Sequence, residues 1–253
     1  QGFGKDKIMT SFIDAVQFLT IFRFRNDRKS CPASSAICFP FVGAFLGVIL
    51  IVLNEVLTKV FPELLVNLIL VTVSIILTGA LHLDGLADTC DAFFSGKNRD
   101  DKLLIMRDPH KGTFGVLGLS IVILFKINLL ALIPVNLKDT AIFLMMVFSR
   151  YSLNIGIGFF PYAREQGKAN IFFEGKKYKN LLLATLITLV LASLTFRAVT
   201  YIVFLLIIIF SLLMNKIFKG VLGGITGDTI GALCELTEII TLLAIFGLST
   251  FYV

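Results

Sequence analysis

The segment 64–83, LLVNLILVTVSIILTGALHL, is an apolar run of 20 residues without a single Asp, Glu, Lys or Arg. A helix needs about 20 consecutive apolar residues to cross the hydrocarbon core of a bilayer. The next eight residues, 84–91, have the sequence DGLADTCD and carry three carboxylates. The stretch therefore predicts a transmembrane helix that ends in an acidic cluster.

The composition of the whole chain indicates the same class of protein. Of the 253 residues, 57% are hydrophobic and 16% are charged, whereas soluble domains have about 45–50% and about 25%. The mean hydropathy is +0.90. These values exclude an ordinary soluble globule, a disordered chain and a disulfide-stapled secreted domain. The four cysteines have no CxxC spacing, so we expect inert reduced thiols rather than a metal–thiolate site.

We predict an all-α fold: a polytopic helical integral membrane protein with about seven transmembrane helices and an N-terminal interfacial helix. Residues 1–253 are expected to form one membrane-embedded domain. The predicted spans cover roughly 39–57, 64–83, 113–134, 140–161, 181–196, 198–214 and 236–253. The fifth span is short and only Arg197 separates it from the sixth, so 181–214 is either a tight helical hairpin or a less regular segment.

The interfacial helix is predicted within residues 8–24, in a cytoplasmic N-terminal segment 1–38. Asp14, Gln17 and Thr20 recur there at a spacing of three. A helix with one polar face of this kind lies on a membrane rather than crossing it.

Basic residues predict the orientation. Of the 23 Lys and Arg residues, 18 lie in four segments between the spans, namely 1–38, 84–112, 162–180 and 215–235. Cytoplasmic loops of membrane proteins carry such an excess. We therefore expect a multi-pass protein of the cell membrane whose long loops and active site face the cytoplasm. The net charge of +6 follows from the same rule, so no nucleic-acid partner is expected.

The acidic cluster is the clearest chemical feature. Asp84, Asp88 and Asp91 fall at i, i+4 and i+7, which is one face of a helix. Three such carboxylates repel one another unless a cation neutralises them, and all-oxygen ligands favour Mg²⁺. We predict catalytic roles for Asp84, Asp88 and the adjacent His82, with the three Asp residues as metal ligands. The alternative is a solvated helix end.

A second cluster lies in the glycine-rich segment 223–231. Asp228 and Glu235 are seven residues apart, again on one helical face, and are predicted as further metal ligands. Glycines let the backbone expose N–H groups to anions. Phosphate binding is accordingly predicted at Gly224, Thr226 and Gly227. The alternative is a re-entrant turn or close helix packing through small residues.

Further substrate-binding candidates are charged residues in two loops and one span. Arg binds phosphate in a bidentate manner and Lys supplies a point charge. The alternative for the loop residues is that they only reflect the excess of Lys and Arg in cytoplasmic loops. A charge within a span needs a partner, and its alternative role is a structural ion pair. The candidates are Arg107, Asp108, Lys111, Arg150, Arg164 and Lys168. Lys126, also in a span, could instead extend its ammonium to the interface.

Taken together, the residues predict a membrane-embedded, Mg²⁺-dependent site for phosphorylated substrates. Carboxylate-held metal would clamp a diphosphate, and Arg and Lys would offset the charge that develops on the leaving phosphate. There is no HExxH or Ser–His–Asp pattern, so zinc hydrolysis and serine chemistry have no support.

The sequence resembles the cobalamin synthase family along nearly its whole length. The matching stretches, in order, are QFLT at 17–20, FPFVG at 39–43, TGALHLDGLADT at 78–89, IMRDPHKGTFG at 105–115, PYAR at 161–164 and GGITGD at 223–228. Two positions depart from the family pattern: Pro109-His110 stands where Ser-Arg is expected, and Cys90 where a small residue is expected.

This resemblance implies the last step of adenosylcobalamin biosynthesis. It implies a Mg²⁺-dependent transferase of substituted phosphate groups, an adenosylcobinamide-GDP ribazoletransferase. The expected partners are adenosylcobinamide-GDP, α-ribazole or its 5′-phosphate, and the lipid bilayer. The products would be adenosylcobalamin or its 5′-phosphate, and GMP.

Two other classes remain as alternatives. A CDP-alcohol phosphatidyltransferase also uses Asp-Gly-x-x-Asp with a metal, but its continuation is missing after Asp91. A secondary transporter would place ionisable residues near the middle of the membrane on broken helices, whereas most acids here fall at the edges of the predicted spans. Whether the chain forms a homo-oligomer stays open.

Overall fold

The computed structural model describes residues 5–24, 32–164, 167, 169–173, 177–195 and 198–249, with side chains of residues 5–8 and 32 left aside. Within these ranges the chain folds into eleven α-helices and two short 3₁₀ helices. They are α1 (Lys5–Leu19), α2 (Pro32–Ser35), η1 (Ala36–Cys38), α3 (Phe39–Leu57), α4 (Glu63–Thr78), α5 (Leu81–Phe94), α6 (Arg99–Ile105), α7 (Thr113–Leu132), α8 (Val135–Phe159), η2 (Asn170–Phe173), α9 (Lys177–Ser193), α10 (Val199–Leu222) and α11 (Gly227–Ser249).

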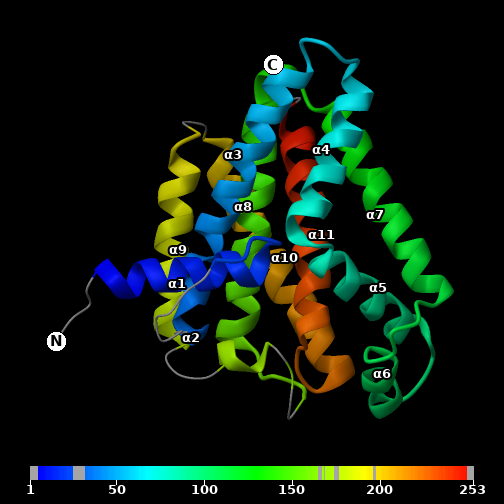
Figure 1. Cartoon of the computed structure of the whole chain (residues 1–253). Helices are drawn as coiled ribbons and strands as arrows, with labels where there is room; N and C mark the ends of the chain where they lie inside the picture. The colour runs from blue at the N-terminus through cyan, green and yellow to red at the C-terminus, as the bar shows by residue number, and fades with distance from the viewer. Residues whose placement is uncertain are drawn as a thin grey trace.

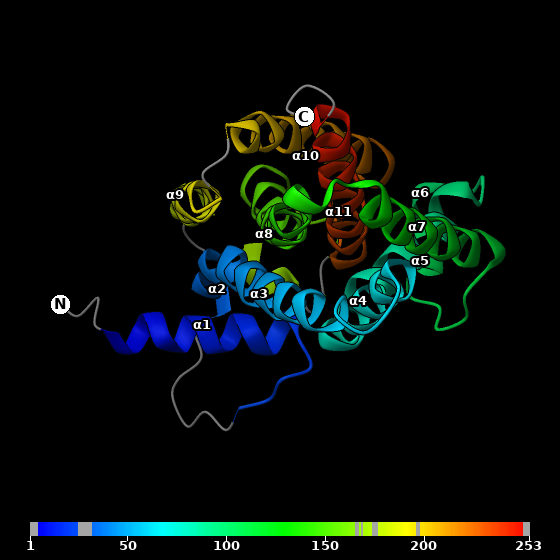
Figure 2. The same cartoon turned by 90° about the horizontal axis from the view of Figure 1, so that it is seen from above.

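The long helices form a bundle around α8, as Figures 1 and 2 show. Helix α8 contacts α3, α9, α10 and α11. Small residues bring α3 and α8 into backbone contact, because a Cβ on Gly43 would lie 2.3 Å from the Met146 carbonyl oxygen. Close approach through small residues is typical of helices that pack in a bilayer.

Five of the described helical segments are long and apolar enough to cross a membrane, and the bent pair α4–α5 makes a sixth if it counts as one span. Their outward faces carry exposed apolar side chains such as Val52, Leu124 and Leu205. The chain is thus a multi-pass helical membrane protein, as predicted. The count of seven is not confirmed, because α9, which covers the predicted span 181–196, has only 17 residues.

The predicted interfacial helix is present as α1. It runs crosswise to the long helices and lies against the side of the bundle, next to α2 and α3 (Figures 1 and 2), and Ala15, Val16 and Leu19 are buried. Helix α1 therefore packs on the bundle from the side and does not run parallel to the spans.

The prediction of one continuous helix over 64–83 is wrong. Helix α4 ends at Thr78, and Gly79 (φ 60°) and Ala80 (φ 56°) both take the left-handed conformation. Helix α5 then leaves at 91° to α4. Glycine takes this conformation freely, whereas alanine does so at a cost of about 1–2 kcal/mol. The acidic cluster therefore lies on a separate helix and not at the end of the second span.

The boundaries predicted near the C-terminus also need correction. Helix α10 continues to Leu222, eight residues past the predicted end at 214, and α11 begins at Gly227 instead of 236. The glycine-rich segment is therefore a four-residue turn, 223–226, followed directly by helix. Asp228 and Glu235 lie within α11.

The segments predicted to share one face do meet. The loop after α8 pairs with the turn before α11, since Ala163 N donates to Ile225 O at 2.8 Å and Ile225 N donates to Pro161 O at 2.9 Å. Arg99 of α6 contacts the same loop, with Nη2 donating to Ala163 O at 3.3 Å. These contacts bring the segments 84–112, 162–180 and 215–235 to the same end of the bundle.

Candidate functional site

Two of the predicted carboxylates converge on one ammonium group. Lys111 Nζ lies 2.6 Å from Asp84 Oδ1 and 2.5 Å from Asp88 Oδ1. Asp84 is 62% exposed and Asp88 only 9%, so the pair reaches from the surface into the protein. Burial lowers the pKa of Lys111, but its hydrogen bonds to Asp84 and Asp88 and their charges outweigh this and raise its pKa overall. Lys111 thus holds a positive charge between two carboxylates one helical turn apart.

Close packing of α5 on α11 brings a third carboxylate to this site. A Cβ on Gly85 would lie 2.7 Å from the Asp228 carbonyl oxygen, and one on Gly231 would lie 3.2 Å from His82 Cα. No larger residue than glycine fits at Gly85 without moving a backbone. The charges of Asp84, Asp88 and Asp228 accordingly act on one another.

Asp228 is paired with an arginine from the loop after α8. Arg164 Nη2 lies 2.8 Å from Asp228 Oδ2, and the Arg164 side chain is 11% exposed. The backbone pairing of residues 161–163 with Ile225 holds this loop in place. Gly224 allows the pairing, because a Cβ there would lie 2.7 Å from the Pro161 carbonyl oxygen. The role of Gly224 in the structure is therefore close backbone approach.

Arg99 was not singled out from the sequence. Its Nε donates to the Leu222 carbonyl oxygen at 2.7 Å, at the C-terminus of α10. Together with the Ala163 contact, this hydrogen bond ties α6 to the loop after α8 and to the end of α10. The only sequence signal was a basic residue in a loop, and such residues occur for topological reasons in any membrane protein.

A pocket of about 270 Å³ lies beside these charged groups. One part of its wall is polar and includes His82, Asp84, Arg164 and Asp228. The other part is apolar and is formed by Phe18, Phe39, Leu81, Leu153, Ile157, Ala169, Phe172 and Ile230. The pocket therefore presents both charged and aromatic side chains to a bound ligand.

His82 belongs to the lining of this pocket but is almost entirely buried. It is 3% exposed, and its Nδ1 has no hydrogen-bond partner in the part of the chain that the structure describes. A buried polar atom without a partner is costly. The catalytic role predicted for His82 stays a prediction.

Asp91 has a different environment from Asp84 and Asp88. Its Oδ2 accepts from Gly112 N at 2.7 Å and its Oδ1 accepts from Gly115 N at 2.8 Å. Both N–H groups belong to the first turn of α7, where a carboxylate is favourable. Asp91 thus caps α7 and fixes the loop that carries Lys111.

Two further loop candidates, Arg107 and Asp108, are exposed. Asp108 Oδ1 accepts from His110 N at 2.9 Å and lies 2.7 Å from His110 Nδ1, and these contacts lower the pKa of Asp108. Asp108 thus stabilises the turn at residues 108–110. Arg107 is exposed and its charge acts on the Tyr162 hydroxyl. Lys168 lies outside the described residues.

Thr226 and Gly227 form the start of α11. Thr226 is fully buried. Its N–H donates to Thr229 Oγ1 at 2.8 Å, and Thr229 N donates back to Thr226 Oγ1 at 3.2 Å. This reciprocal bonding satisfies two N–H groups at the helix start. Gly227, in contrast, lines the pocket.

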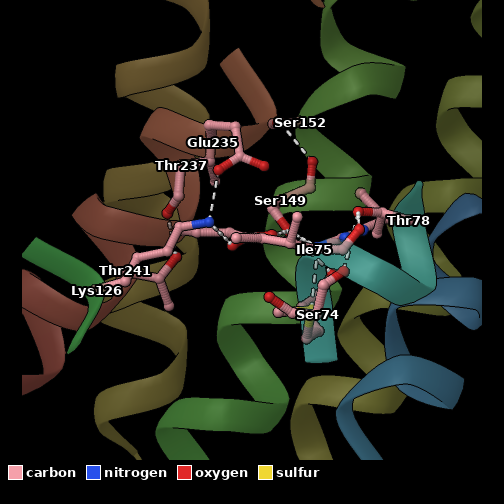
Figure 3. A network of polar contacts seen from close by, with 12 residues as sticks. Ser74, Ile75, Thr78, Lys126, Ser149, Ser152, Glu235, Thr237 and Thr241 are labelled. Atoms are coloured by element: carbon pink, nitrogen blue, oxygen red, sulfur yellow. Dashed lines mark hydrogen bonds and ion pairs between the residues drawn. The ribbon is translucent and has the colours of Figure 1, made fainter. Parts of the chain in front are cut away.

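Two predicted site residues lie instead in a buried charge cluster, shown from close by in Figure 3. Lys126 Nζ lies 2.6 Å from Glu235 Oε2 and 2.5 Å from Glu238 Oε2. Arg150 Nη1 lies 2.5 Å from Glu238 Oε1 and also donates to Ser149 Oγ at 2.8 Å. We call Lys126, Arg150, Glu235 and Glu238 the ion cluster. All four side chains are at most 6% exposed.

The ion cluster corrects three expectations. Glu235, two helical turns beyond Asp228, binds Lys126 and is not grouped with the carboxylates at the surface. Arg150 forms an ion pair with Glu238, which is the structural role given as the alternative to substrate binding. Lys126 does not extend to the interface, because it meets two carboxylates inside the bundle. Glu238 was missed, although two cations within predicted spans required carboxylate partners.

The residues present fit a divalent cation only in part. Among the described residues, no three His, Cys, Asp or Glu side chains are grouped closely enough to hold a metal ion by themselves. Asp84 and Asp88, however, already direct one oxygen each at a common cation, Lys111 Nζ. Mg²⁺ is often held by one or two carboxylates while substrate phosphates and water complete its shell. The pair suits that mode of binding.

Comparison with known proteins identifies relatives over most of the chain. The chain is 34% identical over 239 residues to an adenosylcobinamide-GDP ribazoletransferase of Alkaliphilus metalliredigens, covering 91% of this chain and 92% of that one. It is 35% identical over 208 residues to that of Acetivibrio thermocellus, covering 82% and 84%. With that of Escherichia coli it shares 37% over 223 residues, covering 83% and 86%.

No solved structure matches the chain. The family model described as cobalamin-5-phosphate synthase matches residues 11–246, which include every helix that contributes to the site. This chain belongs to the cobalamin-5-phosphate synthase family.

Proposed function

We propose that this chain catalyses the last step of cobalamin biosynthesis, the joining of adenosylcobinamide-GDP with α-ribazole or its 5′-phosphate and the release of GMP. The family and the names of its relatives support this activity. The observation that carries it is the convergence of Asp84, Asp88 and Lys111 with the Arg164–Asp228 pair beside one pocket. A diphosphate donor requires such a mixture of carboxylate and cationic groups.

In the proposed reaction a ribose hydroxyl of the nucleoside attacks the phosphorus on the cobinamide side of the diphosphate. A new P–O bond forms, the bridging P–O bond breaks, and GMP leaves with the electron pair of that bond. His82, which belongs to the pocket lining, is the side chain that we propose as the acceptor of the hydroxyl proton. Arg164, freed from Asp228 by the substrate, and Lys111 stabilise charge on the phosphates.

We further propose that Asp84 and Asp88 hold Mg²⁺ and that Asp228 supports it. The bound ion would neutralise phosphate charge and polarise the bond to the leaving group. Asp91 and Glu235, the other predicted ligands, are engaged by the start of α7 and by Lys126. They contribute by holding α7 and α11 in position.

The activity is tested with purified protein in detergent or nanodiscs. Adenosylcobinamide-GDP and α-ribazole are supplied with Mg²⁺, and GMP and the corrinoid product are measured by chromatography. We expect GMP and adenosylcobalamin in equal amounts, both dependent on α-ribazole. GMP release without α-ribazole would indicate a hydrolase and overturn the proposal.

We propose that the site faces the cytoplasm across the cell membrane, since most of the basic residues lie in segments at this end of the bundle. In a cysteine-free variant, His110→Cys at the site end and Val135→Cys at the opposite end both place an exposed thiol. A membrane-impermeant maleimide added to intact cells should label only Val135→Cys. Labelling of His110→Cys alone would invert the orientation.

Arg164→Lys separates phosphate binding from a purely topological role. The charge is kept but the planar fork is lost, so we expect the initial rate to fall by about 30- to 1,000-fold if Arg164 contacts phosphate in the transition state. Arg107→Lys tests the exposed loop residue Arg107 in the same way. The matched control is Arg23→Lys, since Arg23 donates only to backbone carbonyls near the end of α1. Wild-type rates in Arg164→Lys and Arg107→Lys would leave only the topological role.

A further inference from the structure

The apolar half of the pocket is built from aromatic rings of three separate elements. Phe18 comes from α1, Phe39 from the start of α3 and Phe172 from η2. Their ring centroids lie 4.6 Å apart for Phe18–Phe172, 5.4 Å for Phe39–Phe172 and 6.1 Å for Phe18–Phe39. We call these three rings the aromatic wall.

The shape of the pocket restricts what the aromatic wall can bind. A volume of about 270 Å³ lies just below the range for pockets of drug-sized ligands, roughly 300–1,000 Å³. Adenosylcobinamide-GDP, with its corrin ring, adenosyl group and GDP, is several times larger than a nucleoside. The pocket can therefore enclose a nucleoside but not the corrinoid donor.

Polarity gives the direction in which a nucleoside would lie. The lining combines the aromatic wall with the charged side chains of Asp84, Arg164 and Asp228. A flat aromatic base stacks on aromatic side chains, while ribose hydroxyls need hydrogen-bond partners. The charged side chains of the lining supply such partners.

We propose that this pocket is the subsite for the incoming nucleoside. Its two-ring aromatic base packs against Phe18, the partly exposed ring of the aromatic wall, which the buried Phe39 and Phe172 support from behind. Its ribose lies toward the charged lining residues Asp84, Arg164 and Asp228. The proposal rests on the proposed function for the identity of the nucleoside, α-ribazole, whose base is a benzimidazole. It assigns α1 to the site, because Phe18 of this helix is part of the aromatic wall. The larger donor then approaches from the exposed side of Asp84.

A fluorescence measurement tests binding independently of turnover. The chain contains no Trp, so Phe18→Trp places one fluorophore in the aromatic wall at a half-buried position. α-Ribazole alone should quench its emission saturably. The matched control is Phe204→Trp, since Phe204 packs against Phe148 and Tyr151 at 5.6 Å and 5.3 Å and does not line the pocket. Its emission should not change, and absence of saturable quenching in Phe18→Trp overturns the proposal.

Steady-state kinetics of Phe18→Leu and Phe172→Leu give a second test. We expect the KM for α-ribazole to rise by about 10-fold or more, while the KM for adenosylcobinamide-GDP stays within about twofold. Phe204→Leu should change neither. If the KM for adenosylcobinamide-GDP or the inhibition constant of GMP rises instead, the pocket belongs to the donor and the proposal is overturned.

The two tests separate this proposal from the proposed function. If wild-type protein forms the product but the Phe variants keep their KM for α-ribazole, only the subsite fails. If wild-type protein releases no GMP, the proposed function fails, and quenching of Phe18→Trp by α-ribazole still decides whether the pocket takes the nucleoside.

Discussion

Glu238→Gln should destabilise the folded protein by about 3–5 kcal/mol. Glu238 contacts both Lys126 and Arg150 at 2.5 Å, and its replacement leaves two buried cations with Glu235 as the one remaining carboxylate of the ion cluster. A buried charge without a counter-charge is costly because it has lost its hydration. The measurement is thermal unfolding of purified protein in detergent, with protein yield in the membrane as a second reading.

The control for this prediction is a surface ion pair. Asp100→Asn removes the partner of Arg99 at 3.0 Å, where the two side chains are 83% and 50% exposed, and should cost at most about 1 kcal/mol. The double variant Glu238→Gln, Lys126→Met removes one charge of each sign. It should be more stable than the sum of the two single changes predicts, because Arg150 and Glu235 stay balanced. Equal unfolding temperatures for wild type and Glu238→Gln would refute this account of the ion cluster.

Asp84→Asn and Asp88→Asn should each reduce turnover by about 100-fold or more while the protein still folds. Each change removes a negative charge from the pair that surrounds Lys111 Nζ and, in our proposal, from the Mg²⁺ site. The half-saturating Mg²⁺ concentration should rise in whichever variant keeps measurable activity. The measurements are GMP release over a Mg²⁺ titration and, since Asp88 is nearly buried, thermal unfolding of each variant.

Asp101→Asn provides the matched control. Asp101 lies in the exposed first turn of α6, where its backbone N–H and carboxylate bond to Asn98. The same change of charge there should leave the rate within about threefold of wild type. Near-normal activity of Asp84→Asn and Asp88→Asn would remove these carboxylates from the reaction.

Prediction from sequence worked best where hydrophobicity alone decides the structure. The span over 39–57 coincides with α3, and 113–134 differs from α7 by two residues, because unbroken apolar runs bounded by Pro, Gly or charge have one stable solution in a bilayer. It failed at 64–83, where left-handed Gly79 and Ala80 break the run. An alanine in that conformation has no signature in the sequence, since only the packing around it offsets the strain.

The charged residues show the same division. Spacing placed Asp84 and Asp88 on one face, and they do meet one cation. Spacing also placed Asp91 with them and Glu235 with Asp228, yet Asp91 caps α7 and Glu235 binds Lys126. Helical periodicity specifies a shared face, but it does not specify which neighbouring helix covers each part of that face.

The sequence by itself determined three features: that this is a helical membrane protein, that the basic loops share one end of the bundle, and that the carboxylates of Asp84 and Asp88 lie together. These depend on hydropathy, charge and local spacing, which are properties of neighbouring residues. Only the tertiary structure decided that Arg164 pairs with Asp228, that Glu238 joins Lys126 to Arg150, and that Phe18, Phe39 and Phe172 form one wall. Each of these depends on contacts between residues far apart in the chain, and such contacts arise from the packing of whole helices.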